Sequence, residues 1–224
     1  MAKIYCIANQ KGGVGKTTTA VNLAAALSQL SFNVLLVDLD PQGNATTGSG
    51  LEKNNLVQSV YEVLLDRADI KKVITHSTSG YDILGSNRKL AAAEEELLSA
   101  ARKELRLKTK LDEVSGQYDV IIIDCPPTLS ILTINAFCAA DGLIIPMTCE
   151  YYSLEGVSDL LLSIRAVREQ VNSGLVITGL LRVKFDPRIT LQREVSEQLS
   201  GYFGSSVFSC LLYTSPSPRD QRGS

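Results

Sequence analysis

A glycine-rich segment near the start of the chain has the residue types and spacing of a phosphate-binding loop. It reads Lys11-Gly12-Gly13-Val14-Gly15-Lys16-Thr17-Thr18 and follows a short apolar run. Glycines let backbone N–H groups point inward at phosphate oxygens, and a helix that begins near Lys16 adds the positive end of its dipole. Lys16 is placed to reach the β- and γ-phosphates, while the Thr17 hydroxyl can ligate Mg²⁺. The segment therefore predicts a nucleotide site.

The loop departs from the usual pattern G-x-x-x-x-G-K-[ST], because Gln10 stands at the first glycine position. A second lysine, Lys11, begins the loop instead. A plain strand-to-helix turn requires only one or two glycines, so the whole string favours nucleotide binding over a purely structural turn.

Three carboxylates follow two further apolar runs. Asp38 and Asp40 lie at the end of the run over Val34–Asp40, and Asp124 ends the run over Val120–Asp124. Carboxylates at the carboxyl ends of parallel strands lie beside the ligand crevice of an open sheet. There, one carboxylate can hold metal-bound water and another can orient the attacking water of a phosphoryl transfer.

The elements that must position these residues are short, β-branched strands alternating with helices. The apolar runs are continuous, as in strands buried on both faces. The predicted strands are Ile4–Ala8, Asn33–Val37, Tyr81–Leu84, Asp119–Ile123, Gly142–Pro146 and Leu175–Val183, and the clearest helices are Thr18–Leu30 and Ser153–Val171. This alternation predicts an α/β fold with a mostly parallel sheet and helices on both faces, a three-layer sandwich of the P-loop NTPase type.

Two connecting segments have distinct compositions. Gln42–Asn55 is rich in Gly, Asn, Ser and Thr and is predicted to be a mobile loop. Arg88–Leu111 is predicted to form one or two exposed helices whose basic residues pair with Glu94–Glu96 and Glu104, an interpretation favoured over nucleic-acid contact.

Composition excludes several classes of protein. The net charge of -2 argues against a basic protein that coats nucleic acid. Five cysteines without a C-x-x-C pair predict neither a disulfide framework nor a zinc ribbon, and Cys125 is expected to be a small buried hydrophobe. No segment approaches the roughly 20 apolar residues of a membrane span. We therefore expect a cytoplasmic chain that does not enter membranes, with His76 on its surface and Tyr151 and Tyr152 packed beneath the site.

Three segments make the chain resemble the ParA/MinD family of deviant Walker A ATPases, and within it the chromosomal ParA (Soj-like) partitioning proteins. They are Ala8–Leu27, Val34–Thr46 and Tyr118–Leu129, and Cys149–Gly156 and Phe185–Leu191 also fit. The resemblance covers Lys3–Phe208. It implies an ATPase that uses ATP and Mg²⁺, with Lys11, Lys16 and Asp40 as catalytic residues.

The resemblance also implies a role for each matching position in the loop. Lys11 is similar to the signature lysine that reaches across a nucleotide-sandwich dimer to the phosphates of the other copy. Lys16 is similar to the Walker lysine, Thr17 to the Mg²⁺ ligand and Thr18 to a contact of the α-phosphate. Gly12, Gly13, Val14 and Gly15 complete the nucleotide-binding set.

For the residues outside the loop, the resemblance implies roles in hydrolysis, metal binding and DNA binding. Asp40 is similar to the carboxylate that orients the hydrolytic water, and Asp124 to the Walker B acid that acts on Mg²⁺ through water. Asp38 is expected to support the metal's ligands. Arg188 matches a position implicated in non-specific DNA binding, which would be directed at phosphates and sensitive to salt.

The function that the resemblance implies is chromosome or plasmid partitioning. Such an ATPase dimerises on ATP, binds DNA non-specifically on the nucleoid, and is stimulated by a ParB-type centromere-binding partner. A MinD-like membrane-cycling ATPase would require a C-terminal amphipathic helix, which Leu211–Ser224 does not offer. A dethiobiotin-synthetase-like ligase is disfavoured by the matches at Asp38–Thr46 and Cys149–Gly156. An inert, truncated nucleotide-binding module is the remaining alternative.

The end of the chain departs from the family. Family members continue with a strand, a Pro-Arg-Asn segment and a closing helix, whereas Leu211–Ser224 is rich in Ser, Pro and Arg and has no periodicity. We therefore expect a C-terminally incomplete ATPase domain over residues 1–210 and a disordered, non-native tail over residues 211–224, a native linker being the alternative.

Overall fold

A computed structural model describes residues 1–150 and 153–212, with side chains over residues 1–150 and 157–209. In this part of the chain, eight strands form one sheet in the order β3-β4-β2-β5-β1-β6-β7-β8. Every ladder is parallel except the one between β3 and β4. The strands are β1 (Lys3–Ile7), β2 (Val34–Asp38), β3 (Thr75–His76), β4 (Asp82–Leu84), β5 (Val120–Asp124), β6 (Gly142–Thr148), β7 (Val176–Val183) and β8 (Val207–Leu212).

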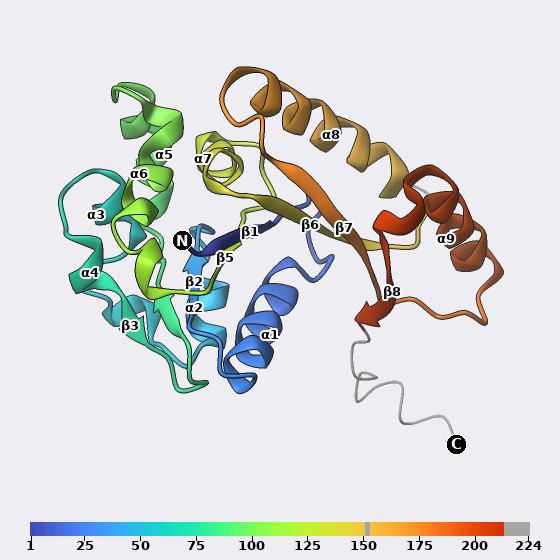
Figure 1. The fold of residues 1–224 in the computed structure, drawn as a ribbon, viewed down its shortest axis with the longest axis horizontal. Coiled ribbons are helices and arrows are strands. Elements are labelled where there is room, and N and C mark those ends of the chain that lie inside the picture. The colour runs from blue at the N-terminus through green and yellow to red at the C-terminus, as the bar shows by residue number, and fades with distance from the viewer. Residues whose placement is uncertain (151–152, 213–224) are drawn as a thin grey trace.

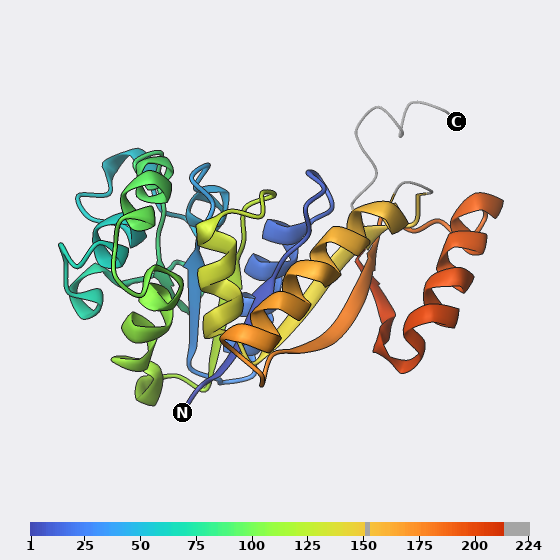
Figure 2. The same ribbon diagram turned by 90° about the horizontal axis from the view of Figure 1, so that it is seen from above.

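Helices cover both faces of this sheet, as predicted. The helices are α1 (Lys16–Gln29), α2 (Asn44–Gly48), α3 (Val60–Leu64), α4 (Ile70–Val73), α5 (Leu90–Leu98), α6 (Arg106–Asp112), α7 (Ile131–Ala139), α8 (Ser153–Gln170) and α9 (Thr190–Phe203). Short 3₁₀ turns occur at Lys53–Asn55, Lys103–Leu105, Ser115–Gln117 and Gly204–Ser206. Figures 1 and 2 show α1 on one face of the sheet and α7 and α8 on the other.

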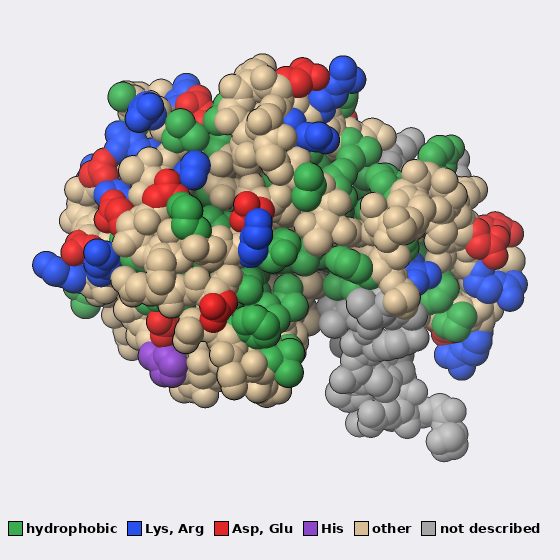
Figure 3. Space-filling model, viewed as in Figure 1, with side chains coloured by type: hydrophobic (Ala, Val, Ile, Leu, Met, Phe, Trp, Pro, Cys, Tyr) green, Lys and Arg blue, Asp and Glu red, His purple; other side chains and the backbone are tan. Residues whose placement is uncertain are grey.

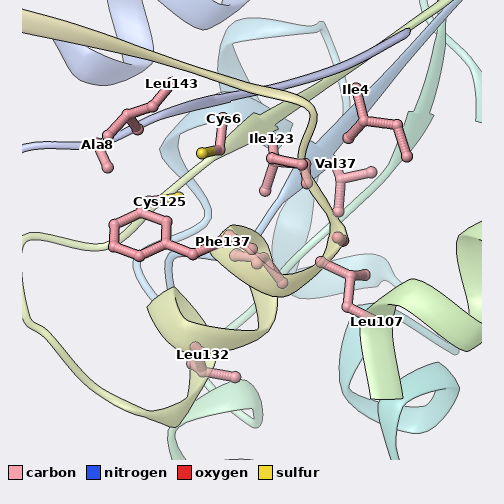
Figure 4. Packing of buried hydrophobic residues seen from close by; sticks show 14 of the residues in the cluster. Ile4, Cys6, Ala8, Val37, Leu107, Ile123, Cys125, Leu132, Phe137 and Leu143 are labelled. Carbon is pink, nitrogen blue, oxygen red and sulfur yellow. The ribbon is translucent and has the colours of Figure 1, made fainter. Parts of the chain in front are cut away.

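Two apolar clusters, one on each face of the sheet, explain why the strand sequences are continuous apolar runs. In β2, Leu35 and Val37 pack into the larger cluster, whereas Val34 and Leu36 pack into the cluster beneath α1. Successive residues of a strand point to opposite faces, and here both faces are covered. In the larger cluster, the Phe137 ring of α7 points toward Cys6 and Cys125 (Figure 4). Cys125 is 1% exposed, which confirms it as a small buried hydrophobe.

The six predicted strands are present, with ends that differ by one or two residues. Two strands were not predicted: β3, which has only two residues, and β8 at the sheet edge. The prediction of a loop without regular structure over Gln42–Asn55 is wrong, because α2 and a 3₁₀ turn form there. Strand β8 reaches Leu212, two residues beyond the predicted domain end, and the remainder of the predicted tail lies outside the described residues.

Arg88–Leu111 forms α5, a 3₁₀ turn and most of α6, and its apolar residues Leu90, Leu97 and Leu107 are buried. The charged residues of this segment do form ion pairs, but with other partners than predicted. The basic residues Arg106 and Lys110 pair with Asp66, and the acidic Glu96 pairs with Arg67. The histidine lies on the surface as expected (purple in Figure 3).

The prediction for Tyr151 and Tyr152 falls outside the described residues. Among the helices of the described part, none combines the length and apolar character needed to cross a membrane.

Candidate nucleotide-binding site

The predicted phosphate loop lies between β1 and α1. Gly13 and Gly15 adopt left-handed backbone conformations with φ of 71° and 78°, which L side chains rarely adopt. A Cβ atom at Gly12 or Gly13 would have no other heavy atom within 4 Å, so open space adjoins the loop at these positions. The helix begins at Lys16 without a side-chain cap, which leaves its first N–H groups directed toward that end. The loop therefore has the open, glycine-lined backbone that suits an anionic ligand.

Lys16 lies largely buried behind the loop. Its Nζ donates a hydrogen bond to the carbonyl oxygen of Lys11 at 3.2 Å. Burial lowers the pKa of Lys16, and the nearby carboxylates of Asp124 and Asp40 oppose this shift. A buried ammonium that has given up most of its water gains strongly from contact with an anion.

The carboxylates meet the loop because three parallel strands end side by side. In the sheet, Asp124 of β5 is in register with Ile7 of β1 and with Asp38 of β2. The backbone N–H of Leu39 donates to the carbonyl oxygen of Asp124 at 2.9 Å, which extends this pairing past the end of β2. The structure thus brings together the phosphate loop and all three predicted aspartates at the carboxyl edge of the sheet.

Asp124 is the unpaired acid of this site. Its side chain is fully buried, and within the described residues neither carboxylate oxygen has a hydrogen-bond partner of good geometry, although the Thr17 hydroxyl lies nearby. Burial, followed by the neighbouring Asp38, raises the pKa of Asp124 to about 8, although the nearby Thr17 hydroxyl and Lys16 lower it. A buried carboxylate without partners is costly unless a cation or a metal-bound water meets it.

Asp38 is fully engaged by protein donors. One oxygen accepts the backbone N–H of Thr46 at 2.8 Å and the Thr46 hydroxyl at 2.7 Å, and the other accepts the N–H of Asp40 at 3.1 Å. Burial raises the pKa of Asp38 to about 6 despite these hydrogen bonds. Asp38 therefore anchors the segment that carries Asp40 and starts α2.

Asp40 lies nearer the surface of the site, with 9% of its area exposed. Its Oδ1 accepts the N–H of Gln42 at 2.9 Å, and its carbonyl oxygen accepts the Ser86 hydroxyl at 2.8 Å. The first bond orients the Asp40 carboxylate and the second holds its backbone, while the second carboxylate oxygen is free of any described hydrogen bond. That oxygen can accept a proton or orient a water molecule.

Magnesium fits this donor set. No group of three or more His, Cys, Asp or Glu side chains in the described residues forms a ready-made metal cage. Mg²⁺ usually retains several waters and binds through one or two protein groups together with substrate phosphates. Thr17 and the unpaired Asp124 match that requirement, and the open loop leaves room for the phosphates.

Two charged residues that sequence reasoning missed also lie at the loop. Glu150 forms an ion pair with Lys11, and Lys184 donates to the carbonyl oxygen of Gly13 at 3.3 Å. Glu150 lies inside a segment that fits the family resemblance, but neither residue carries a sequence signal for a contact with the loop. Arg188 lies in the connection between β7 and α9, where its guanidinium pairs with Asp186.

A parallel sheet with a glycine-rich loop between its first strand and helix, faced by a buried lysine and by carboxylates on neighbouring strands, defines a P-loop nucleotide-binding protein. A family model described as "AAA domain" matches residues 2–177. The protein Soj of Bacillus subtilis, a sporulation initiation inhibitor, is 48% identical over 95% of this chain and 84% of its own length. The chromosome partitioning protein ParA of Myxococcus xanthus is 43% identical over 95% of this chain and 75% of its own length. The chain belongs to the ParA/Soj branch of the AAA-domain family of P-loop ATPases.

Solved structures agree with this assignment. The cobyrinic acid a,c-diamide synthase of Mycobacterium smegmatis, determined with bound ADP and magnesium, superimposes with a TM-score of 0.87 at 38% identity, over 99% of this chain and 88% of that one. A plasmid partition protein of Borrelia burgdorferi superimposes with a TM-score of 0.80 at 29% identity, over 99% of this chain and 92% of that one. The predicted fold class is confirmed, and the nucleotide and magnesium in the first structure agree with the ATP and Mg²⁺ predicted for this family.

Proposed function

We propose that the chain is a partitioning ATPase that binds Mg-ATP, dimerises on it, binds DNA non-specifically and hydrolyses ATP under stimulation by a ParB-type partner. The observation that carries the proposal is the meeting of Lys16, Asp40 and the unpaired Asp124 at one glycine-rich loop. In this site Lys16 and the loop N–H groups hold the phosphates, while Thr17 and Asp124, the latter through water, hold Mg²⁺. Magnesium held there would supply positive charge to offset the charge of the phosphates.

Asp40 is the residue that we assign to the attacking water. Its free carboxylate oxygen is near the surface of the site, Ser86 holds its backbone carbonyl, and the N–H of Gln42 holds its other carboxylate oxygen. The structural neighbour that is named a plasmid partition protein, and the relatives that are named chromosome partitioning proteins, support a partitioning role. We assign dimer formation to Lys11 and DNA contact to Arg188, and we place the working protein on the nucleoid in the cytoplasm.

The test is ATP turnover by the purified chain with Mg²⁺, DNA and a ParB-type protein. We expect the Lys16→Ala and Asp40→Ala variants to lose about 100-fold or more of the stimulated rate, the loss typical when a group that stabilises or orients the transition state is removed. Lys3→Ala is the matched control, because Lys3 is exposed and pairs with Asp141. Lys3 begins β1, at the opposite end of this strand from the phosphate loop. Equal rates in the wild type and in both site variants would contradict the proposal.

A further inference from the structure

Lys184 supplies a third lysine to the phosphate loop. It follows β7 directly, its side chain is exposed, and its backbone is left-handed with φ of 56°. Its Nζ donates to the carbonyl oxygen of Gly13 at 3.3 Å. A residue other than glycine is uncommon in this backbone region and is held there at some cost by its surroundings. The turn after β7 thus directs a flexible cation at the loop.

Glu150 is close to two of these lysines. It follows β6, and its carboxylate forms an ion pair with the ammonium of Lys11. The hydrogen bond from Lys11 holds the pKa of Glu150 below its usual value, and the charge of Lys184 lowers it further. The carboxylate therefore interacts with both cations; of the two, only Lys11 is bonded to it, and the Thr148 hydroxyl donates a further hydrogen bond.

The pairing of β6 with β7 accounts for this closeness. Thr148, the last residue of β6, is in register with Val183, the last residue of β7. Glu150 and Lys184 therefore follow neighbouring strand ends. Both residues form hydrogen bonds with the loop. Glu150 accepts one from the Lys11 ammonium, whereas Lys184 donates one to the carbonyl oxygen of Gly13.

In this arrangement of the loop, the ammonium group of each of the three lysines donates a hydrogen bond to an oxygen atom of the protein. Lys16 donates to the carbonyl oxygen of Lys11, Lys11 pairs with Glu150, and Lys184 donates to Gly13. A phosphate that draws Lys11 away leaves the Glu150 carboxylate without its bonded cation beside a polyanion, and like charges at short range repel. Lys184 can relieve this repulsion, because it gives up only a bond to a neutral carbonyl.

We propose that Lys184 is a positioning residue that takes Glu150 over from Lys11 when Mg-ATP binds and Lys11 turns to the phosphates held by the second copy. The inference rests on the proposed function, since it requires that the loop binds nucleotide phosphates. Glu150 then holds Lys11 through the ion pair in the nucleotide-free chain, and Lys184 lowers the free-energy cost of releasing Lys11. Lys184 acts through Glu150 and does not itself contact the phosphates.

The experiment is a set of calorimetric titrations with Mg-ATP at low ionic strength. Lys184→Met should weaken binding about three- to fivefold, the scale of one partly exposed ion pair, and Lys184→Arg should restore it. Glu150→Gln should tighten binding by a similar factor, because Lys11 is no longer held. In the Glu150→Gln background, Lys184→Met should have no further effect. Lys3→Met is the matched control for lost surface charge, and circular dichroism checks that each variant is folded.

Four outcomes would overturn the inference. If Lys184→Met weakens binding equally with and without Glu150, then Lys184 acts directly on the nucleotide or the loop. If Lys184→Met behaves like Lys3→Met, or if Glu150→Gln does not tighten binding, the exchange does not occur. A wild-type chain that binds no Mg-ATP would refute the proposed function itself, and the inference with it. Disappearance of the differences in high salt would support an exchange between ion pairs.

Discussion

The buried carboxylate of Asp124 lowers the free energy of unfolding, and we propose that it is retained in order to bind a cation. It lies fully buried with both carboxylate oxygens unpaired, next to the buried Asp38. A structural role would normally require hydrogen-bond partners, as Asp38 has. The missing partners therefore favour a functional role for Asp124, in which the cost of burial is recovered when Mg²⁺ and its waters arrive.

The Asp124→Asn variant should change how stability depends on pH. The pKa of Asp124 is raised from 3.8 to about 8, so the folded chain binds more protons than the unfolded chain between these values. The free energy of unfolding therefore falls as pH rises through this window. Asparagine removes this titration, so the stability advantage of the variant over the wild type should be roughly 3 to 4 kcal/mol larger at pH 8 than at pH 5. Urea denaturation at both pH values without Mg²⁺ measures this difference.

Asp112→Asn is the control for that measurement, because Asp112 is an exposed carboxylate on α6 paired with Lys108. It should leave the pH dependence close to that of the wild type. If Asp124→Asn also leaves it unchanged, Asp124 is not the buried, unpaired acid that the structure describes.

At the scale of elements, α2 depends on tertiary hydrogen bonds that its own residues do not reveal. Apart from Ala45, its sequence, Asn44–Gly48, consists of residues with low helix propensity. The helix forms because Thr46 is bonded to Asp38 on one side and accepts the N–H of Ser86 at 2.8 Å on the other. Contacts with β2 and with the end of β4 therefore override the local preference for a loop.

The Thr46→Val variant tests this dependence. Valine has nearly the same shape but removes the hydroxyl, which leaves the buried N–H of Ser86 unpaired and takes one donor from Asp38. We expect a loss of about 2 to 4 kcal/mol in the free energy of unfolding. Thr47→Val, at an exposed position whose hydroxyl reaches only the Gly43 carbonyl, should cost about 1 kcal/mol or less. Similar losses in both variants, measured by urea denaturation, would show that α2 is not held through Thr46.

The difference between local residue patterns and contacts between distant segments explains how much could be predicted from the sequence. Strands β1, β2 and β5 and the loop after β1 were predictable, because apolar runs, glycines and aspartates mark them locally. The ion pair between Lys11 and Glu150 joins residues 139 positions apart, and the bond from Lys184 to Gly13 spans 171 positions. Lysines and glutamates of this kind are common on surfaces, and only the strand order β1-β6-β7 brings them together.

At the scale of the whole molecule, a near-neutral chain must present positive charge locally in order to bind DNA. The net charge is -2, and the candidate Arg188 is 88% exposed. Its guanidinium is bonded to both oxygens of Asp186, at distances from 2.7 to 3.1 Å. The hydrogen bond from Arg188 lowers the pKa of Asp186 to about 2, so the carboxylate is charged at neutral pH and the pair presents no net charge.

Releasing Arg188 should therefore strengthen DNA binding. Asp186→Asn keeps an oxygen that can accept the N–H of Arg188 but removes the charge that holds the guanidinium. We expect binding to random-sequence DNA, measured with ATP present by fluorescence anisotropy, to tighten about three- to tenfold at low salt and its salt slope to steepen by about 1. Arg188→Ala should weaken binding and reduce the slope by a similar amount. Glu169→Gln is the matched control, because it also removes one negative charge and frees an arginine, Arg165 on α8. If Glu169→Gln tightens binding as much as Asp186→Asn, the gain reflects total charge alone and Arg188 does not lie on the DNA-binding face.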